Sequence, residues 1–286
     1  MKAQPECLAC IFRQAINTAK IASEDQKVHE TVIRTLAEEV KNMSLTQTPA
    51  AVSQYVYEIV QDVSGVHDPF KKIKKETNRA ALAVLPKLEN LVFSSEDPLK
   101  SAIHLAVAGN VIDMGTNFDL DVERDVLAIA DQAFVIDDIE NFRSEIGKGT
   151  SLLYLADNSG EIVFDRIFVE ELLKLGAEVT LAVKSGPIIN DVTMEDAEFT
   201  GLTKITKIIE TGSADIGINW EKSSDEFKKV FLNSDVIISK GHGNFETLSG
   251  TDYNIYFLLK AKCECVAEEL GVPMGSIAFK KNRPEQ

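Results

Sequence analysis

The sequence lacks the features that mark a disulfide-rich or membrane-spanning protein. Its 286 residues contain only four cysteines, too few for a disulfide framework in a chain of this length. No run of about 18 apolar residues is present, as a membrane-spanning helix would need. The opening residues, MKAQPECLAC, do not have the basic-then-apolar layout of a signal peptide. We therefore expect a cytoplasmic protein with no membrane partner.

Basic residues are also scarce relative to acidic ones. Thirty Lys and Arg stand against 45 Asp and Glu, which gives a formal net charge of −15. A surface of this charge repels a phosphate backbone, so nucleic acid is not an expected partner. Any anionic substrate would need a bound cation or local lysines to offset the same field.

The cysteines occur as two short pairs, Cys7-x-x-Cys10 and Cys263-x-Cys265. A four-thiolate metal site would require the two ends of the chain to meet, and the second pair lacks the usual two-residue spacer. Both pairs fall in helix-like segments, where cysteine serves as a small core residue. We favour buried structural thiols over a zinc site.

The first part of the chain, residues 1–130, has a helical pattern. Thr48-Pro49, Asp68-Pro69 and Asp97-Pro98 each place a capping residue before a proline suited to the first turn of a helix. Ser23 and Gln26 predict a capping box at the start of a further amphipathic helix. The pattern predicts an all-helical N-terminal region.

The second part, residues 131–286, alternates short apolar runs with segments long enough for helices. The runs are AFVID, SLLYLA, EVTLAV, KITKII, DVIIS and GSIAF. Continuously apolar strands suit a parallel sheet that is covered on both faces. We predict an α/β fold with a Rossmann-like, mostly parallel sheet flanked by helices.

Polar residues follow three of the predicted strands. The segments are DNSGE at 157–161, KSGPIIND at 184–191 and KGHGNFE at 240–246. In open parallel sheets, ligands bind beyond the carboxyl ends of the strands. Each segment alone also reads as a turn or a helix cap, but three together favour a binding site.

The residue types in these segments indicate a metal ion and an anion. Asp157, Asn158 and Asp191 supply hard oxygen donors, which suit Mg²⁺, Mn²⁺ or a similar ion. Lys184 and Lys240 stand beside glycine-rich turns whose amides can approach an anion. His242 reads as an exposed loop residue rather than a general acid. Glu246 is suited to orienting the substrate and to capping the following helix, and the two roles are not exclusive.

These motifs resemble those of the damage-control phosphatase family. The match includes DNSGE, KSGPIIND and SKGHGNFE in the second part of the chain. CLAC at 7–10, DPF at 68–70 and AGNVID at 108–113 resemble the cysteine-bearing branch of that family, found mainly in archaea and bacteria.

The resemblance implies metal-dependent hydrolysis of small phosphate esters, sugar phosphates among them. It implies Asp157, Asn158 and Asp191 as metal ligands, the two aspartates being also catalytic, and an ion such as Mn, Ni, Co or Mg. It implies that Lys240 is also catalytic and contacts the phosphate. Other expected substrate contacts are Lys184, Gly241, Asn244 and Glu246, joined by Asn110 and Asp113 from the helical region. The expected partner is a small phosphorylated metabolite.

Two other functions remain open on the sequence alone. A methyltransferase that uses S-adenosylmethionine also places acidic residues after the strands of such a sheet, although the expected glycine-rich first turn is missing. A non-catalytic metal or nucleotide sensor is the other alternative. If the protein is a phosphatase, either a water or an aspartate is the nucleophile. The residue pattern does not indicate an oligomeric state.

Overall fold

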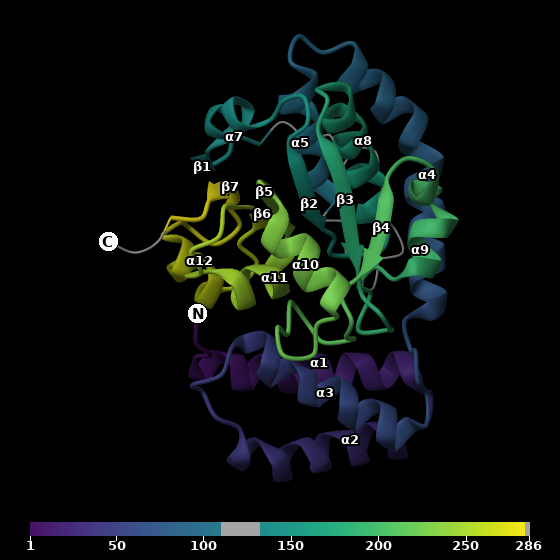
Figure 1. The fold of residues 1–286 in the computed structure, drawn as a ribbon. Helices are drawn as coiled ribbons and strands as arrows, with labels where there is room; N and C mark the ends of the chain where they lie inside the picture. The colour runs from purple at the N-terminus through teal and green to yellow at the C-terminus, as the bar shows by residue number, and fades with distance from the viewer. Residues whose placement is uncertain (110–131, 284–286) are drawn as a thin grey trace.

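The computed structural model describes residues 1–109 and 132–283. Helices cover a central sheet, and a further helical layer lies beyond one end of its strands (Figure 1). The helices before the sheet are α1 Pro5–Ala22, α2 Gln26–Glu39, η1 Val40–Asn42, α3 Pro49–Ser64, α4 Lys71–Phe93 and α5 Pro98–Gly109. Those between and after the strands are α7 Ile139–Glu145, α8 Glu161–Lys174, α9 Met194–Phe199, η2 Leu202–Lys204, α10 Asp225–Asn233, α11 Gly241–Leu248 and α12 Glu264–Leu270.

The sheet has seven strands among the described residues, in the order β1-β7-β6-β5-β2-β3-β4. The strands are β1 Ile136–Asp137, β2 Ser151–Leu155, β3 Glu178–Val183, β4 Lys207–Glu210, β5 Val236–Lys240, β6 Ile255–Lys260 and β7 Ile277–Lys281. Five neighbours, β4, β3, β2, β5 and β6, run parallel, while β7 pairs antiparallel with β6 and parallel with β1. The predicted Rossmann-like, mostly parallel sheet is confirmed.

The order of the strands changes side at β2: the strands that follow it in the chain are added first on one side of β2 and then on the other. Leu155 near the end of β2 lies beside Ala182 of β3 on one side and beside Ser239 of β5 on the other. The chain runs from β2 outward to β3 and β4, then returns to the other side of β2 as β5. Such a switch point opens a crevice beyond the strand ends.

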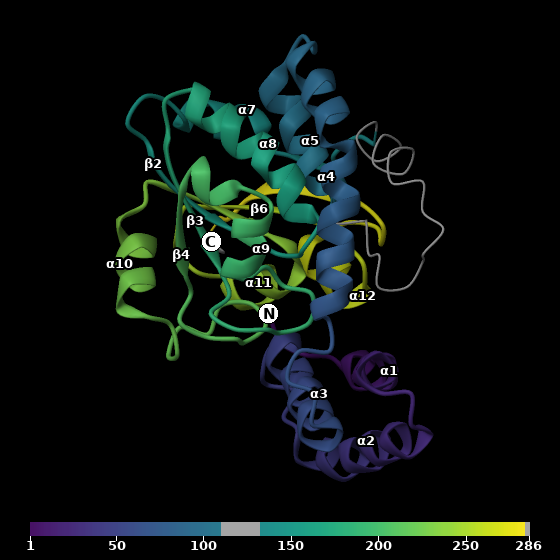
Figure 2. The same ribbon diagram turned by 90° about the vertical axis from the view of Figure 1, so that its right-hand side faces the viewer.

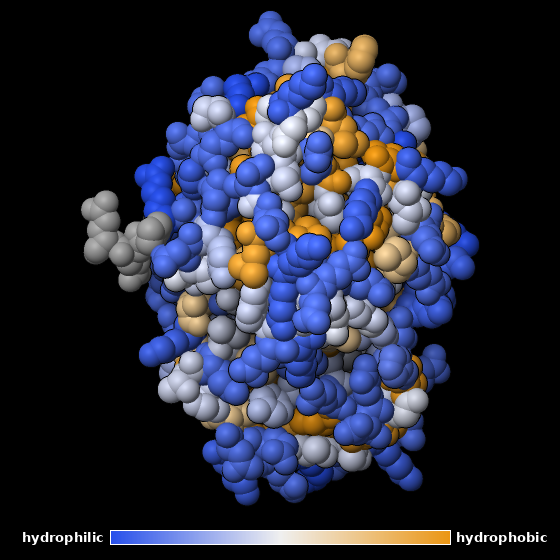
Figure 3. Space-filling model, viewed as in Figure 1, coloured by the Kyte–Doolittle hydropathy of each residue, from blue (hydrophilic) through white to orange (hydrophobic). Residues whose placement is uncertain are grey.

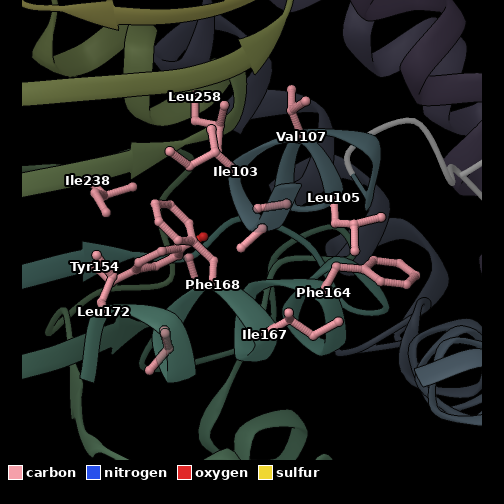
Figure 4. Packing of buried hydrophobic residues seen from close by; sticks show 14 of the residues in the cluster. Ile103, Leu105, Val107, Tyr154, Phe164, Ile167, Phe168, Leu172, Ile238 and Leu258 are labelled. Carbon is pink, nitrogen blue, oxygen red and sulfur yellow. The ribbon is translucent and has the colours of Figure 1, made fainter. Parts of the chain in front are cut away.

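Helices cover both faces of the sheet with separate apolar cores. On one face, α4, α5 and α8 pack against alternate strand residues such as Tyr154 and Ile238. Figure 4 shows Ile103 of α5 and Phe168 of α8 meeting over this face. On the other face, α10, α11 and α12 pack against the intervening residues, such as Leu153 and Ile237. This alternation is what strand geometry requires of a sheet that is buried on both sides.

The helices α1, α2 and α3 form a third core of their own, the helical layer. Its buried residues include Ile11 of α1, Val32 of α2 and Val56 of α3. Ile188, from the loop after β3, joins this core and connects the layer to the sheet edge. Figure 2 shows α4 running from the helical layer up along the sheet.

The helix starts agree with the sequence prediction at two of four places. Helices α3 and α5 begin at Pro49 and Pro98 as expected. Helix α4 begins at Lys71, because Asp68 caps a preceding turn by accepting from the amide of Phe70 at 3.1 Å. The capping box at Ser23 is wrong: Ser23 ends α1, and Asp25 caps α2 by accepting from the amide of Lys27 at 2.8 Å.

Two further expectations need correction. Strand β6 was not predicted, because its run YFLLK continues without a break into residues that suit a helix equally well. The cysteines are not all buried thiols, since Cys265 is buried, Cys7 and Cys263 are half-buried, and Cys10 is exposed.

Hydrophilic side chains dominate the face drawn in Figure 3, with smaller hydrophobic areas between them. Within residues 1–109 and 132–283, no helix is long and apolar enough to cross a membrane.

Candidate metal and phosphate site

Two loops at the ends of β2 and β3 are joined by backbone hydrogen bonds. The amide of Val192 donates to the carbonyl of Asp157 at 2.9 Å, and the amide of Ser159 donates to the carbonyl of Asn190 at 2.8 Å. Asn158 and Asp191 thereby form an isolated antiparallel bridge. The side chains of Asp157, Asn158 and Asp191 are brought to one place, as the sequence predicted.

The loop after β3 is held in an unusual conformation next to Asp191. Ile189 has a φ of 45°, the one positive φ among the described residues other than glycine. A branched residue with this φ is strained, and such strain persists only where the surroundings enforce it. Here the amide of Asp191 donates to the carbonyl of Ile188 at 3.0 Å, which fixes the turn that presents the carboxylate.

Gly241 allows β5 to end against Asp157. Its φ is 77°, and a Cβ at this position would lie 1.9 Å from Oδ2 of Asp157. Only glycine therefore fits both the backbone conformation and the space. Gly241 shapes the site through its lack of a side chain.

A second glycine turns the chain from β2 into α8. Gly160 has a φ of 79°, and a Cβ there would lie 2.3 Å from Cγ2 of Thr77. Its backbone amide donates to Oδ1 of Asn78 at 2.6 Å, and the side-chain Nδ2 of Asn78 donates to Oδ1 of Asp196 at 2.9 Å. Helix α4 thus fixes the start of α8, directly after the candidate metal ligands.

A cavity of about 280 Å³ opens at these loops, between the sheet edge and the helical layer. It is lined by Gln14, Ala50, Ser53, Asp157, Asn158, Ile189, Asp191, Ile216, His242, Gly243, Glu246 and Lys262. Two helices of the helical layer, α1 and α3, supply Gln14, Ala50 and Ser53. The site therefore has a floor of strand ends and a roof of helices.

Buried carboxylates that lie close together raise one another's pKa in the cavity. Burial, together with the charges of Glu161 and Asp191, raises the pKa of Asp157 well above its ordinary value. Burial raises the pKa of Asp191 to about 6, although Lys184 and Lys74 oppose the shift. A positive charge placed between the two aspartates would restore their ionised forms.

Lys240 does not face the cavity. Its ammonium lies 2.5 Å from Oε1 of Glu161, 2.5 Å from Oδ1 of Asp165 and 2.8 Å from the carbonyl of Ala106. Burial alone would lower the pKa of Lys240, but the two carboxylates raise it above the ordinary value. Three acceptors thus surround this fully buried ammonium under α5 and α8, and Lys240 is not among the residues that line the cavity.

Lys184 also lies behind the cavity wall. Its ammonium donates to the carbonyl of Gly217 and is 3.8 Å from Oδ2 of Asp191. Burial lowers its pKa, while the charges of Asp191, Asp157 and Asp215 oppose the shift. Lys184 therefore supports Asp191 from behind.

Helix α11 contributes two expected contacts of different kinds. Asn244 is buried, and its side-chain Nδ2 donates to the carbonyls of Lys240 at 2.9 Å and Ala156 at 3.2 Å, which ties β5 to β2. Glu246 lines the cavity, and burial raises its pKa to about 7 despite a hydrogen bond from the amide of Ala50. Glu246 does not cap a following helix, because it lies within α11 and accepts from Ala50 in the first turn of the earlier helix α3.

His242 is half-buried in α11, so the expectation of an exposed loop residue is wrong. Its Nε2 lies 2.6 Å from the carbonyl of Lys260 and 3.1 Å from the amide of Lys262. One nitrogen cannot donate and accept at once, and the shorter contact makes it the donor to Lys260. Burial lowers the pKa of His242 to about 4, which keeps it neutral.

Lys262, Gln14 and Ser53 line the cavity but were not predicted. Among the residues in the structure's described ranges, Lys262 is the one lysine or arginine in the cavity lining. The missed strand β6 explains its omission, because Lys262 follows β6 as the other motifs follow their strands. No local pattern marks Gln14 or Ser53. Asn110 and Asp113 lie outside the described residues.

Comparison with known proteins identifies relatives over nearly the whole chain. Residues 3–278 match the family model of the damage-control phosphatase ARMT1-like domain. A damage-control phosphatase of Pyrococcus horikoshii is 36% identical over 99% of both chains. One of Archaeoglobus fulgidus is 33% identical, covering 98% of this chain and 99% of its own. The crystal structure of a DUF89 family protein from Pyrococcus horikoshii is 35% identical, with a TM-score of 0.90 over 99% of this chain and all of that one.

Proposed function

The chain belongs to the damage-control phosphatase ARMT1-like family, and from this premise we propose that it is a metal-dependent hydrolase of small phosphate monoesters. The observation that carries the proposal is the cavity in which Asp157, Asn158 and Asp191 lie together, with Lys262 in the same lining. Sugar phosphates or related damaged metabolites are the proposed substrates.

The donor set fits a divalent ion. Asn158 donates its amide hydrogens to Asp157 at 2.7 Å and toward Glu161 at 3.4 Å, so its carbonyl oxygen is the atom suited to ligation. Two carboxylates and one amide are hard donors that match Mn, Ni, Co or Mg. Within the described ranges, no three His, Cys, Asp or Glu side chains form a ready metal group, so the amide is a necessary member of the set. When bound, the ion supplies Lewis-acid charge to the phosphate.

The chain's own residues supply the other contacts. Lys262 replaces Lys240 as the proposed phosphate-binding cation, since its side chain lines the cavity and its charge acts on Asp157. Glu246, with a pKa of about 7, is partly protonated at neutral pH and donates a hydrogen bond to the substrate. Gln14 and Ser53 line the roof of the cavity, where they would contact the part of the substrate beyond the phosphate. Because helices α1 and α3 cover one side of the cavity, they limit the access of water to the reacting phosphate.

Phosphate release tests the proposal. Purified protein is incubated with a panel of sugar phosphates and with Mn²⁺, Co²⁺, Ni²⁺ or Mg²⁺, with and without chelator. We expect release that needs the metal and falls about 100-fold or more in Asp191→Asn, because the variant loses a ligand charge. Asp252→Asn, at an exposed position, is the matched control and should retain wild-type activity. Full activity in folded Asp191→Asn would overturn the site assignment.

Binding measurements on the same purified protein distinguish the proposed phosphatase from a methyltransferase and from a metal sensor. Binding of S-adenosylmethionine without phosphate release would favour a methyltransferase. Tight metal binding with no turnover of any phosphate ester would favour a sensor.

A further inference from the structure

The two cysteine pairs meet, although they come from opposite ends of the chain. Cys7 and Cys10 lie in the first half of α1, Cys263 is the N-cap of α12, and Cys265 lies in its first turn. The Sγ of Cys7 accepts from the amide of Gln4 at 3.4 Å, and burial together with the neighbouring Cys7 thiol raises the pKa of Cys265 to about 12. All four cysteines are free thiols. The two ends of the chain therefore do meet, which the sequence alone did not show.

Several contacts hold this meeting in place. The Sγ of Cys265 lies 3.8 Å from the carbonyl of Lys2, and the side-chain amide of Gln4 donates to Glu268 of α12 at 3.0 Å. The N-terminal ammonium lies 3.4 Å from the carbonyl of Glu246 in α11. Residues 1–4 are therefore fastened along α11 and α12, which positions Cys7 beside Cys265.

The arrangement favours chemistry between two thiols over a metal site. A zinc site needs three or four ligands around one point, and the described residues contain no group of three His, Cys, Asp or Glu placed to hold an ion. Cys7 and Cys265 are held against the same short segment, at Gln4 and Lys2, so a disulfide between them needs only these two sulfurs to meet. Cys7 is half-buried and accessible to a small oxidant, whereas Cys265 is buried behind it.

We propose that Cys7 and Cys265 form a reversible disulfide when the protein meets a disulfide oxidant such as oxidised glutathione. The Cys7 thiolate attacks one sulfur of the oxidant and releases one glutathione thiolate. The Cys265 sulfur then displaces the second glutathione from the mixed disulfide. The protein loses two electrons and two protons, and the oxidant gains both to become two glutathione thiols.

The cross-link would join two helices next to the cavity. Helix α1 carries the lining residue Gln14, and α12 begins at Glu264, two residues after the lining residue Lys262. A disulfide between the two helices would close a loop of almost the entire chain, which restricts the unfolded state strongly. We expect oxidation to raise the Tm of the protein by roughly 5 °C or more.

The test treats the full chain with oxidised glutathione and counts free thiols with a chromogenic reagent. The expected count falls from four to two, peptide mass mapping shows Cys7 joined to Cys265, and dithiothreitol restores four. Cys10→Ser, the matched control, should still form the bond, and Cys265→Ser should not. If a variant fails to fold, peptide mass mapping of the oxidised wild-type protein still shows whether Cys7 is joined to Cys265.

Three results would overturn the proposal. The first is retention of all four thiols at full oxidant concentration. The second is a bond between Cys7 and Cys10, or a stable glutathione adduct, in place of the expected pair. The third is stoichiometric zinc in the purified protein, which would make the four cysteines a metal site.

Discussion

Neighbouring residues at the end of β5 have unrelated roles. Lys240 is fully buried with Glu161 and Asp165, while Gly241 allows close packing against Asp157. Strand alternation explains the direction of Lys240, because Val236 and Ile238 pack on the α5 and α8 face, and Lys240 lies two residues further on. The same alternation was readable in the sequence, but the partners on α8 were not.

Lys240 and Lys262 should respond differently to the loss of their charge. Lys240→Met leaves two carboxylates buried without their cation, so we expect the free energy of unfolding to fall by about 3–5 kcal/mol. Lys262→Met removes a charge from a cavity wall, and we expect stability within about 0.5 kcal/mol of wild type. Phosphate release by Lys262→Met should fall at least about tenfold, mainly through KM.

Urea unfolding and steady-state kinetics on both variants make this comparison. If Lys262→Met has wild-type kinetics, the phosphate-binding role of Lys262 is wrong.

Alanine substitutions at two glycines with similar φ distinguish backbone strain from steric contact with the site. Gly241 and Gly271 have φ of 77° and 71°, but only at Gly241 would a Cβ meet Asp157. We expect Gly271→Ala to lose about 1 kcal/mol of stability and keep its activity. Gly241→Ala should lose phosphate release almost completely, because Asp157 must move. Equal activity in the two variants would contradict the close packing described for the site.

At the scale of elements, apolar runs predicted most strands, and the strand ends indicated the site. Strand β6 was missed because a short apolar run next to helix-compatible residues has no distinct period. Its omission also hid Lys262, which follows it. Capping signals were ambiguous where two candidate caps, Ser23 and Asp25, stood close together.

Helix α4 reaches the site through Asn78. This buried side chain accepts from the amide of Gly160 and donates to Asp196, so it connects three elements. We expect Asn78→Leu to lower the free energy of unfolding by about 2–3 kcal/mol, because both partners lose a buried hydrogen bond. Activity should also fall, since the start of α8 follows Asp157 and Asn158 directly.

Asn90→Leu is the matched control on the same helix, because Asn90 is exposed. Its stability should stay within about 0.5 kcal/mol of wild type. Chemical unfolding measures both variants, and equal stabilities would show that Asn78 does not connect the three elements energetically.

For the whole molecule, the site lies where the sheet edge meets the helical layer. The sequence indicated the floor, because local motifs follow β2, β3 and β5. It could not indicate the roof, because Gln14 and Ser53 reach the cavity only through packing of the helical layer, and no local pattern encodes that packing. The net charge of −15 makes a local cation necessary for an anionic substrate, and we propose that Lys262 and a bound ion supply it.

The central claim is that this cavity binds a divalent ion and a phosphate group together. The most direct measurement is anomalous X-ray scattering from crystals soaked with Mn²⁺ and inorganic phosphate. We expect one manganese peak bounded by oxygens of Asp157, Asn158 and Asp191, with the phosphate between the ion and Lys262. A manganese peak elsewhere, or a phosphate bound at Lys240, would contradict it.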